Sequence, residues 1–324
     1  MAARANAEGR ALRPSAAWPA PAAPPPVRPR GRALRPAFSR TLTRLGPLAP
    51  AVVLLAVFMA APIGWAVYAS FTNEALTGVG AAGTSFIGFA NFTRMFADPS
   101  FRQSLILTVV FTVGSGVIGQ NVLGLLLALL MRGRNSIFRS VIGTIIVASW
   151  VIPEIVAAFV WYAYLNDQGT LNSALHFLHL PHPSWLYVYP MFSVIVANIW
   201  RGTAFSMLVY SAAMSSLPTD VMEAASVDGA NAWQRLLRVT IPLLKRTIMT
   251  NLMLVTLQTL SVFTLIFALT AGGPGTASST LPIYMYQEAF KFYQLGYGAA
   301  MTLVLLVIGA IFSLIYVRVL RVES

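Results

Sequence analysis

The sequence predicts an all-α integral membrane protein with six transmembrane helices. Of its 324 residues, 57% are hydrophobic and only 10% are charged, and the mean hydropathy is +0.70. These values are far from those of a soluble globular domain. Long stretches between consecutive charged residues also have the length of membrane spans, because a bilayer core requires about 20 apolar residues of helix.

Three of the spans are runs of 29, 29 and 26 residues without any charged side chain. Two more are hydrophobic throughout but contain Glu154 and Arg201, and a charge at that depth in a membrane requires a specific environment. The remaining span ends at a loop rich in glycine and proline. The predicted spans are residues 45–73, 103–131, 138–164, 187–214, 247–271 and 292–317.

Lysine and arginine are concentrated in alternate connections between these spans. Eighteen of the 22 basic residues lie before the first span, after the second, after the fourth and after the sixth, whereas the other connections hold three. The positive-inside rule therefore predicts that both termini are cytoplasmic, in a multi-pass protein of the inner or plasma membrane. The basic residues that give the net charge of +12 are then expected to contact the anionic headgroups of the lipid bilayer, and no nucleic-acid partner is predicted.

The N-terminal segment has a different composition from the rest of the chain. Residues 1–46 are rich in proline, alanine and arginine, and Pro21–Pro26 contains four prolines. Such a segment cannot bury enough apolar surface to fold. We expect a disordered cytoplasmic tail at 1–46, followed by a six-helix transmembrane domain at 47–320.

No catalytic site, metal site or cofactor is predicted. The absence of cysteine excludes thiolate nucleophiles and cysteine-based metal sites. His176, His179 and His182 are spaced like helical metal ligands, but Pro181 and Pro183 interrupt the helix, so an ordinary external loop is favoured. The sequence also lacks the G-x-x-x-x-G-K-[ST] loop that holds nucleotide phosphates. The chain is therefore predicted to be no enzyme, and any ATP is expected to be hydrolysed by another subunit.

The connection at residues 215–243 predicts a helix-turn-helix on the cytoplasmic surface of the membrane. Thr219 or Asp220 can cap the start of a first helix, and Gly229 permits a left-handed exit from it. A second short helix is expected to run into Pro242. From these features alone, an amphipathic connector without a special role is an equally good interpretation.

Residue groups in this connection resemble a known motif. Glu223-Ala224-Ala225, Asp228-Gly229-Ala230 and Ile241-Pro242-Leu243 are similar to the EAA motif of binding-protein-dependent ABC importer permeases. Trp200-Arg201-Gly202 and residues 269–275 are similar to the carbohydrate, maltose-type branch of that family. The resemblance covers roughly residues 47–320 and implies the type I ABC importer permease fold.

The resemblance implies a heteromeric machine. It implies a second permease subunit, two ATP-binding subunits, an external solute-binding protein, and a carbohydrate substrate of di- or oligosaccharide size. A glycerol-phosphate diester is the alternative substrate, although a phosphate would favour more cations than the single Arg201 within the spans. An ion-coupled secondary transporter is less favoured, since the sequence contains no convincing internal repeat.

The resemblance also implies that the loop couples the permease to the ATPase. A helix in this loop would enter a groove on the ATPase and transmit the motion of the ATPase to the spans as a rigid body. The carboxylates of Glu223 and Asp228 would hydrogen-bond to cationic groups of the ATPase. If the loop merely caps the bundle, substitutions in it would instead reduce the amount of permease. The expected coupling residues are Glu223, Ala224, Ala225, Asp228, Gly229 and Ala230.

Glu154 and Arg201 are expected to face a central cavity on the substrate pathway. Trp150 lies four residues before Glu154 and Phe205 four residues after Arg201, so each pair shares a helical face and combines an aromatic ring with a polar group, as sugars require. The alternative is an ion pair between Glu154 and Arg201 that only fixes the helices. The resemblance adds Gly202, Gln258, Thr259 and Thr264 to this pathway. The glycines and Pro274 at residues 272–275 end the helix and let the backbone approach a partner closely, so we expect an external loop that contacts the binding protein or lines the cavity mouth. A plain turn is an equally good interpretation of the same residues.

Overall fold

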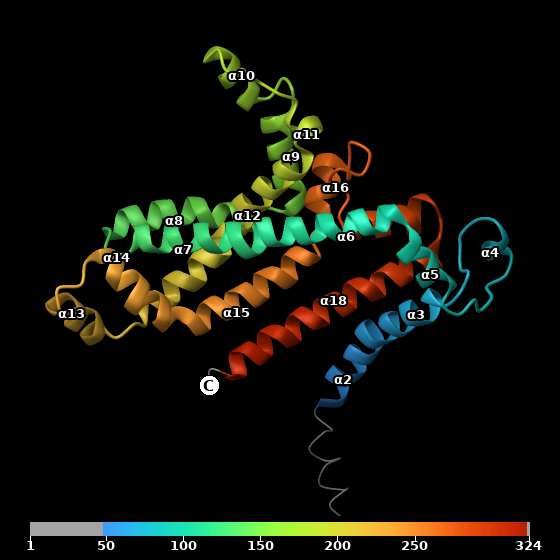
Figure 1. Ribbon diagram of the computed structural model, residues 1–324, viewed down its shortest axis with the longest axis horizontal. Coiled ribbons are helices and arrows are strands. Elements are labelled where there is room, and N and C mark those ends of the chain that lie inside the picture. Colours follow the sequence, from blue (N-terminus) through green and yellow to red (C-terminus); the bar gives the residue numbers. More distant parts are fainter. Residues whose placement is uncertain (1–47, 323–324) are drawn as a thin grey trace, which may run out of the picture. The chain divides into compact units, whose positions relative to one another are not determined.

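The computed structural model describes residues 48–322, and the regular elements within them are helical (Figure 1). One isolated antiparallel bridge joins Thr72 and Phe86. The tail predicted at residues 1–46 lies outside the described residues. The chain divides after Leu55 into two units. Helix α2 (Ala49–Leu55) belongs to the first unit, and the elements from Ala56 onward belong to the second.

Helices long and apolar enough to cross a membrane confirm the predicted fold class. Four stretches within residues 48–322 qualify by themselves, and two pairs of helices qualify if each bent pair is counted as one span, which gives up to six. The four are Ala49–Ser70, Pro99–Met131, Pro190–Ser215 and Leu295–Val319. The two bent pairs are Ser136–Val151 with Glu154–Phe177, and Ala232–Leu260 with Thr264–Thr270.

The second span is one long helix with a π-type middle, formed by α6 (Pro99–Phe111), η3 (Thr112–Gln120) and α7 (Asn121–Met131). It begins where the Asp98 carboxylate accepts a hydrogen bond from the backbone N–H of Ser100 at 2.8 Å, an N-terminal cap of the usual kind. Within η3, a Cβ on Gly116 would lie 2.7 Å from the Thr259 hydroxyl oxygen. The glycine therefore lets the fifth span approach closely.

The third predicted span, over 138–164, is broken into two helices. Helix α8 (Ser136–Val151) ends before Pro153, and α9 (Glu154–Leu165) leaves at an angle of 105°. Pro153 has no N–H to continue the helix, and it disfavours the helical conformation at Ile152, whose ψ is 131°. The break places Glu154 in the first turn of α9, so the expectation that Trp150 and Glu154 share one helical face was wrong. Short helices α10 (Thr170–Phe177) and α11 (Trp185–Val188) follow.

The fourth span is the unbroken helix α12 (Pro190–Ser215), and α13 (Thr219–Val227) follows it. The next helix runs without interruption from Ala232 to Leu260 through α14 (Ala232–Arg235), η4 (Leu236–Thr240) and α15 (Ile241–Leu260). The expected short helix that stops at Pro242 was therefore wrong. The wider π-type turn η4 precedes this proline and accommodates the missing hydrogen bond.

The fifth span also departs from the predicted helix over 247–271. It breaks at residues 261–263, and α16 (Thr264–Thr270) is bent by 49° from the preceding helix. No proline or glycine marks the break. Phe263, which precedes α16, has a φ of −121° and a ψ of −56°, outside the range of the α-helix.

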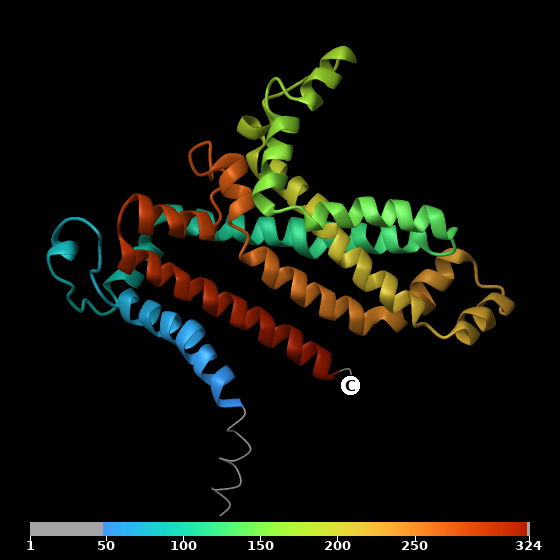
Figure 2. The same ribbon diagram turned by 180° about the vertical axis from the view of Figure 1, so that it is seen from behind.

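The remaining elements lie before the second span and after the fifth span in the sequence. These are η2 (Ala56–Ala60), α3 (Ala61–Ser70), α4 (Val79–Ala82), α5 (Ala90–Ala97), α17 (Leu281–Tyr286), η5 (Gln287–Lys291) and α18 (Leu295–Val322). Helix α18 packs along α3 and also contacts α15, as both ribbon views show (Figures 1 and 2).

A polar cluster ties α6, α17 and α18 together at one end of the unit. The Asp98 carboxylate accepts hydrogen bonds from the hydroxyls of Tyr284 and Tyr297. Burial raises the pKa of Asp98, but the bonds from Tyr284, Ser100 and Tyr297 outweigh it and hold the pKa below its ordinary value of 3.8. Asp98 is therefore held as a carboxylate.

Apolar clusters fill the two ends of the helices and leave their middle polar. One cluster includes Phe111 of α6 and Val194 of α12, and another includes Ala128 of α7 and Met207 of α12. Beside the second cluster, the fully buried Asn251 amide donates to the Asn121 side-chain oxygen at 2.7 Å and to the Ser206 hydroxyl at 2.9 Å. These bonds tie α15 to α7 and α12.

Candidate functional site

A cavity of about 270 Å³ lies midway along the spans, between these two apolar clusters. It is formed where η3, the break between α8 and α9, the middle of α12 and the end of α15 meet. Seven of the eight residues predicted for the substrate pathway line it, and Thr264 does not. The lining residues are Gln120, Trp150, Glu154, Asn198, Arg201, Gly202, Phe205, Gln258, Thr259, Ser261 and Val262.

Two aromatic rings form one wall of this cavity. The ring centroids of Trp150 and Phe205 are 5.8 Å apart and their planes are inclined by 38°. Trp150 is the last but one residue of α8, directly before the break, and Phe205 lies one turn beyond Arg201 on α12. The break in the third span therefore positions an apolar surface beside charged groups, which is the combination that a sugar ring with its hydroxyls can use.

Glu154 and Arg201 face each other within the cavity. The closest approach between their side chains joins the Arg201 Nη1 and Glu154 Oε1 atoms at 3.9 Å, and each side chain is 25% exposed. This is a single long contact, unlike the bidentate pair that arginine forms with carboxylate when it serves to fix two helices. The buried Nε of Arg201 has no hydrogen-bond partner among the described residues. Both groups retain hydrogen-bonding capacity toward the cavity.

Gln120 and Asn198 line the cavity although the sequence analysis did not select them. The Gln120 amide donates to the backbone oxygen of Asn198 at 3.1 Å, and the Asn198 amide donates to the Ser115 hydroxyl at 2.8 Å. A Cβ on Gly202 would lie 2.2 Å from the end of the Gln120 side chain. Gly202 therefore makes the space that Gln120 occupies. A polar amide in the middle of an apolar span was the available signal for both residues.

The break in the fifth span forms the opposite wall. Gln258 and Thr259 lie in the last turn of α15, and Ser261 and Val262 form the break itself. Thr264 begins α16 on the far side of the 49° bend, which explains why it does not share the cavity with them.

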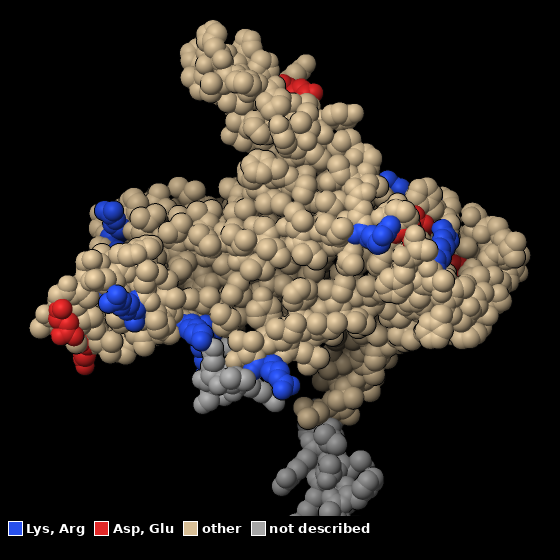
Figure 3. Space-filling model, in the orientation of Figure 1, with Lys and Arg blue, Asp and Glu red and all other residues tan. Residues whose placement is uncertain are grey.

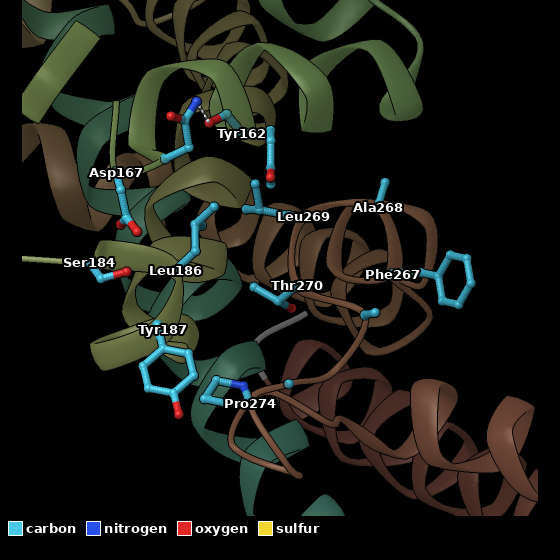
Figure 4. Close-up of a pocket in the computed structure, with 13 residues that line it drawn as sticks. Tyr162, Asp167, Ser184, Leu186, Tyr187, Phe267, Ala268, Leu269, Thr270 and Pro274 are labelled. Carbon is cyan, nitrogen blue, oxygen red and sulfur yellow. Dashed lines mark hydrogen bonds between the residues drawn. The ribbon is translucent and has the colours of Figure 1, made fainter. Parts of the chain in front are cut away.

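A second pocket, of about 530 Å³, lies between the segment from α9 to α11 and the end of α16 (Figure 4). Figure 4 shows Asp167, Ser184 and Tyr187 on one side and Thr270 and Pro274 on the other. Its lining includes Gly273 and Pro274, so part of the loop at residues 272–275 lines a pocket.

The turn of the predicted helix-turn-helix has the conformation that Gly229 suggested. Gly229 has a φ of +77°. The backbone N–H of Gly229 donates to the Ser226 carbonyl at 3.2 Å, and that of Ala230 donates to the Ala225 carbonyl at 3.1 Å, which together form a Schellman motif. The C-terminus of α13 is thereby defined. Neither Thr219 nor Asp220 caps its start, because Pro218 is the N-cap residue and no side chain accepts from the first turn.

The turn after α13 is fixed from the other side as well. Asn231 and Gln234 form a capping box, with bonds of 2.8 and 2.9 Å between side chain and backbone. The Arg235 guanidinium donates to the Ser226 hydroxyl at 3.0 Å, which links α14 to α13. Acidic side chains gather over α13 in Figure 3, and Glu223 and Asp228 are exposed. The element is compact and presents small and acidic residues to its surroundings.

Comparison with known proteins places this chain in a family. Residues 120–321 match the family model described as "Binding-protein-dependent transport system inner membrane component". The chain is 32% identical over 285 residues to the sulfoquinovosyl glycerol transport system permease protein SmoG of Agrobacterium fabrum, which covers 86% of this chain and 90% of that protein. It is 33% identical over 242 residues to the trehalose/maltose transport system permease protein MalF of Thermococcus litoralis, which covers 73% of this chain and 80% of that protein.

The fold is also that of solved transporters. A chain in the crystal structure of a bacterial alginate ABC transporter, in complex with its pentasaccharide-bound periplasmic protein, matches with a TM-score of 0.73 and 24% identity. The match covers 86% of this chain and 94% of that chain. At this level of identity the likeness concerns the fold.

Proposed function

This chain belongs to the family of binding-protein-dependent transport system inner membrane components, and we propose that it is the permease subunit of an ATP-driven importer for a carbohydrate of di- or oligosaccharide size. The observation that carries the proposal is the cavity midway along the spans. It combines the rings of Trp150 and Phe205 with the polar groups of Glu154, Arg201 and Gln258. A polar cavity at this depth is a site through which a hydrated solute can pass.

Each group in the cavity has a distinct role in this proposal. The aromatic pair stacks against the apolar face of a sugar ring. Glu154 and Arg201, whose long contact leaves them incompletely paired, hydrogen-bond to ring hydroxyls, and Gln258 and Thr259 do so from the opposite wall. A second permease subunit completes the cavity. The relatives named for transport of trehalose, maltose and sulfoquinovosyl glycerol support this substrate class.

The proposed machine includes subunits outside this chain. Two ATP-binding subunits dock on the cytoplasmic side and hydrolyse ATP, and an external binding protein delivers the sugar at the end where Gly273 and Pro274 line the larger pocket. Both termini are cytoplasmic, in agreement with the distribution of basic residues. The alginate transporter of similar fold, which was solved with its periplasmic protein, supports such an assembly.

In this arrangement α13 is the coupling element. Ala224 and Ala225 are small enough to let the helix enter a groove on the ATPase, and the exposed Glu223 and Asp228 meet cationic groups there. Gly229 and Ala230 end the helix sharply, and the capping box and the Arg235–Ser226 bond keep α13 rigid relative to α14. Because α14 continues into α15 without interruption, a displacement of α13 reaches Gln258 and Thr259 at the cavity.

Transport by the complete complex in proteoliposomes tests the proposal. We expect uptake of radiolabelled sugar to require ATP and the binding protein. We also expect uptake to be insensitive to ionophores, which dissipate the ion gradient that an ion-coupled transporter would need. Trp150→Ala is expected to reduce uptake strongly while the complex assembles normally. Trp185→Ala is the matched control, because this tryptophan lies in α11 outside the cavity. Equal uptake by wild type and Trp150→Ala would contradict the proposed pathway.

The alternative substrate, a glycerol-phosphate diester, is less well matched by the cavity. Arg201 is the cation among its lining residues, and the Glu154 carboxylate lies 3.9 Å from it. A phosphate in this position would meet that carboxylate. Uptake of a glycerol-phosphate diester in preference to any sugar would reverse the assignment.

A further inference from the structure

A separate pocket, of about 190 Å³, lies at the end of the spans where α7 ends, α8 begins and α12 ends. Its apolar wall is made of Ala128, Met131 and Met214. Its polar wall is made of Arg132, Arg139, Ser211 and Ser215, with Gly133 between the helices. No carboxylate is among these lining residues.

The two arginines in this pocket are free to bind a ligand. Among the residues that the structure describes, neither the Arg132 nor the Arg139 side chain makes a hydrogen bond or an ion pair, and Ser211 is also without a side-chain partner. Ser215 differs, because its hydroxyl donates to the Ala212 carbonyl at 2.7 Å. Two guanidinium groups and one hydroxyl therefore point to an anionic ligand with several acceptor oxygens, such as a phosphate.

The turn that carries these groups is fixed before any ligand binds. Gly133 adopts a φ of +74°, and the Asn135 side chain accepts from the Phe138 N–H at 2.8 Å to cap α8. The third arginine of the segment, Arg134, lies over the Phe138 ring at 6.0 Å and does not line the pocket. The pocket thus selects two of the three arginines of this basic segment.

The depth of the pocket identifies the source of the phosphate. Met131 and Ser215, which are the last residues of two candidate spans, line it, so it lies where the hydrocarbon core gives way to headgroups. Leu130 directly precedes Met131 and Ile137 lies two residues before Arg139, and their side chains are 62% and 75% exposed. Apolar side chains exposed at this level suit acyl chains, whereas a free phosphate ion gains nothing from them.

We propose that this pocket binds the phosphodiester headgroup of an anionic phospholipid, with Arg132 and Arg139 on the phosphate and the acyl chains along the exposed apolar surface. The absence of a carboxylate from the lining disfavours lipids whose headgroup carries an ammonium group. Phosphatidylglycerol, which has a net negative charge and an uncharged glycerol head, has the chemistry that the pocket accepts.

Native mass spectrometry of the purified transporter complex tests this proposal. The complex is reconstituted in nanodiscs of phosphatidylcholine with phosphatidylglycerol, extracted, and examined for retained lipid. We expect wild type to retain phosphatidylglycerol, and we expect the double variant Arg132→Gln, Arg139→Gln to retain it about thirtyfold less, since each arginine near the headgroups contributes about one factor of five. Arg134→Gln is the matched control, and it should retain lipid like wild type. Added inorganic phosphate should not displace the lipid.

Three results would overturn the proposal. Equal retention by the double variant, or equal loss in Arg134→Gln, would show that the pocket itself does not select the lipid. Displacement by inorganic phosphate would identify a site for a soluble anion. Loss of the ATP-binding subunits from the double variant with unchanged lipid retention would assign the arginines to a protein contact. The variant Arg132→Lys, Arg139→Lys retains the charge and should recover most of the lipid, which separates loss of binding from misfolding.

Discussion

Replacing Gly202 by alanine tests the architecture of the central cavity directly. An added Cβ would lie 2.2 Å from the Cδ and Oε1 atoms of Gln120. These atoms belong to the far end of a flexible side chain, so we expect Gln120 to rotate away and lose its bond of 3.1 Å to the Asn198 carbonyl. That loss costs about 1 kcal/mol, whereas replacing glycine by alanine within a helix gains about 1 kcal/mol.

The two contributions nearly cancel, so the melting temperature of the Gly202→Ala complex should stay close to that of wild type. Transport should nevertheless change, because the displaced Gln120 amide enters a cavity of about 270 Å³. If its intrusion costs the bound sugar one or two hydrogen bonds, the KM for uptake rises about tenfold.

A double-mutant cycle isolates this mechanism. In a Gln120→Ala background the side chain that alanine would displace is absent, so adding Gly202→Ala should change the KM less than twofold. The assay is sugar uptake in proteoliposomes, with thermal unfolding of each complex measured in parallel. A Gly202→Ala variant with unchanged KM, or the same tenfold effect in the Gln120→Ala background, would refute the argument.

Three further predictions concern other parts of the chain. Gly229→Ala introduces a Cβ at a φ of +77° with no atom within 4 Å, so strain of about 1–2 kcal/mol should lower ATPase recovery and substrate-stimulated hydrolysis. Gly78→Ala, at a φ of +72° and a ψ of −153° in open space, should be strained at least as much without that loss. Asp98→Asn should lower the melting temperature at neutral pH. Because the folded pKa of Asp98 is depressed, its contribution is present above the ordinary value of 3.8 and disappears as the pH falls through the folded value, so wild type and variant should converge in acid. Asn251→Ala removes a buried amide that hydrogen-bonds to Asn121, Ser206 and Tyr210, and it should destabilise the complex by about 1–3 kcal/mol, measured by thermal unfolding. Thr250→Ala, on the exposed side of α15, should have little effect.

The membrane spans and some local backbone geometry of this protein could be predicted from its sequence alone. The cost of placing a charge in hydrocarbon is large enough that uncharged runs and the distribution of basic residues delimit the spans. Local geometry was equally accessible where one residue type is required, as at Gly229, which adopts the positive φ that ends α13. Arg201 and Phe205 could be grouped because residues four apart on α12 share a helical face. Trp150 and Glu154 lie on different helices, and the break at Pro153 brings them to the same cavity.

The tertiary structure decided what the sequence pattern left open. Gln120 and Asn198 join the cavity because η3 and α12 pack closely there, a contact between residues 78 positions apart in the chain that no local pattern specifies. The breaks at Pro153 and at residues 261–263 set which side chains converge, and the second of them directs Thr264 away. Hydropathy measures the free energy of moving a segment into lipid, and a bent helix pair has the same composition as a straight one. The direction of each helix after its break therefore depends on packing against its neighbours.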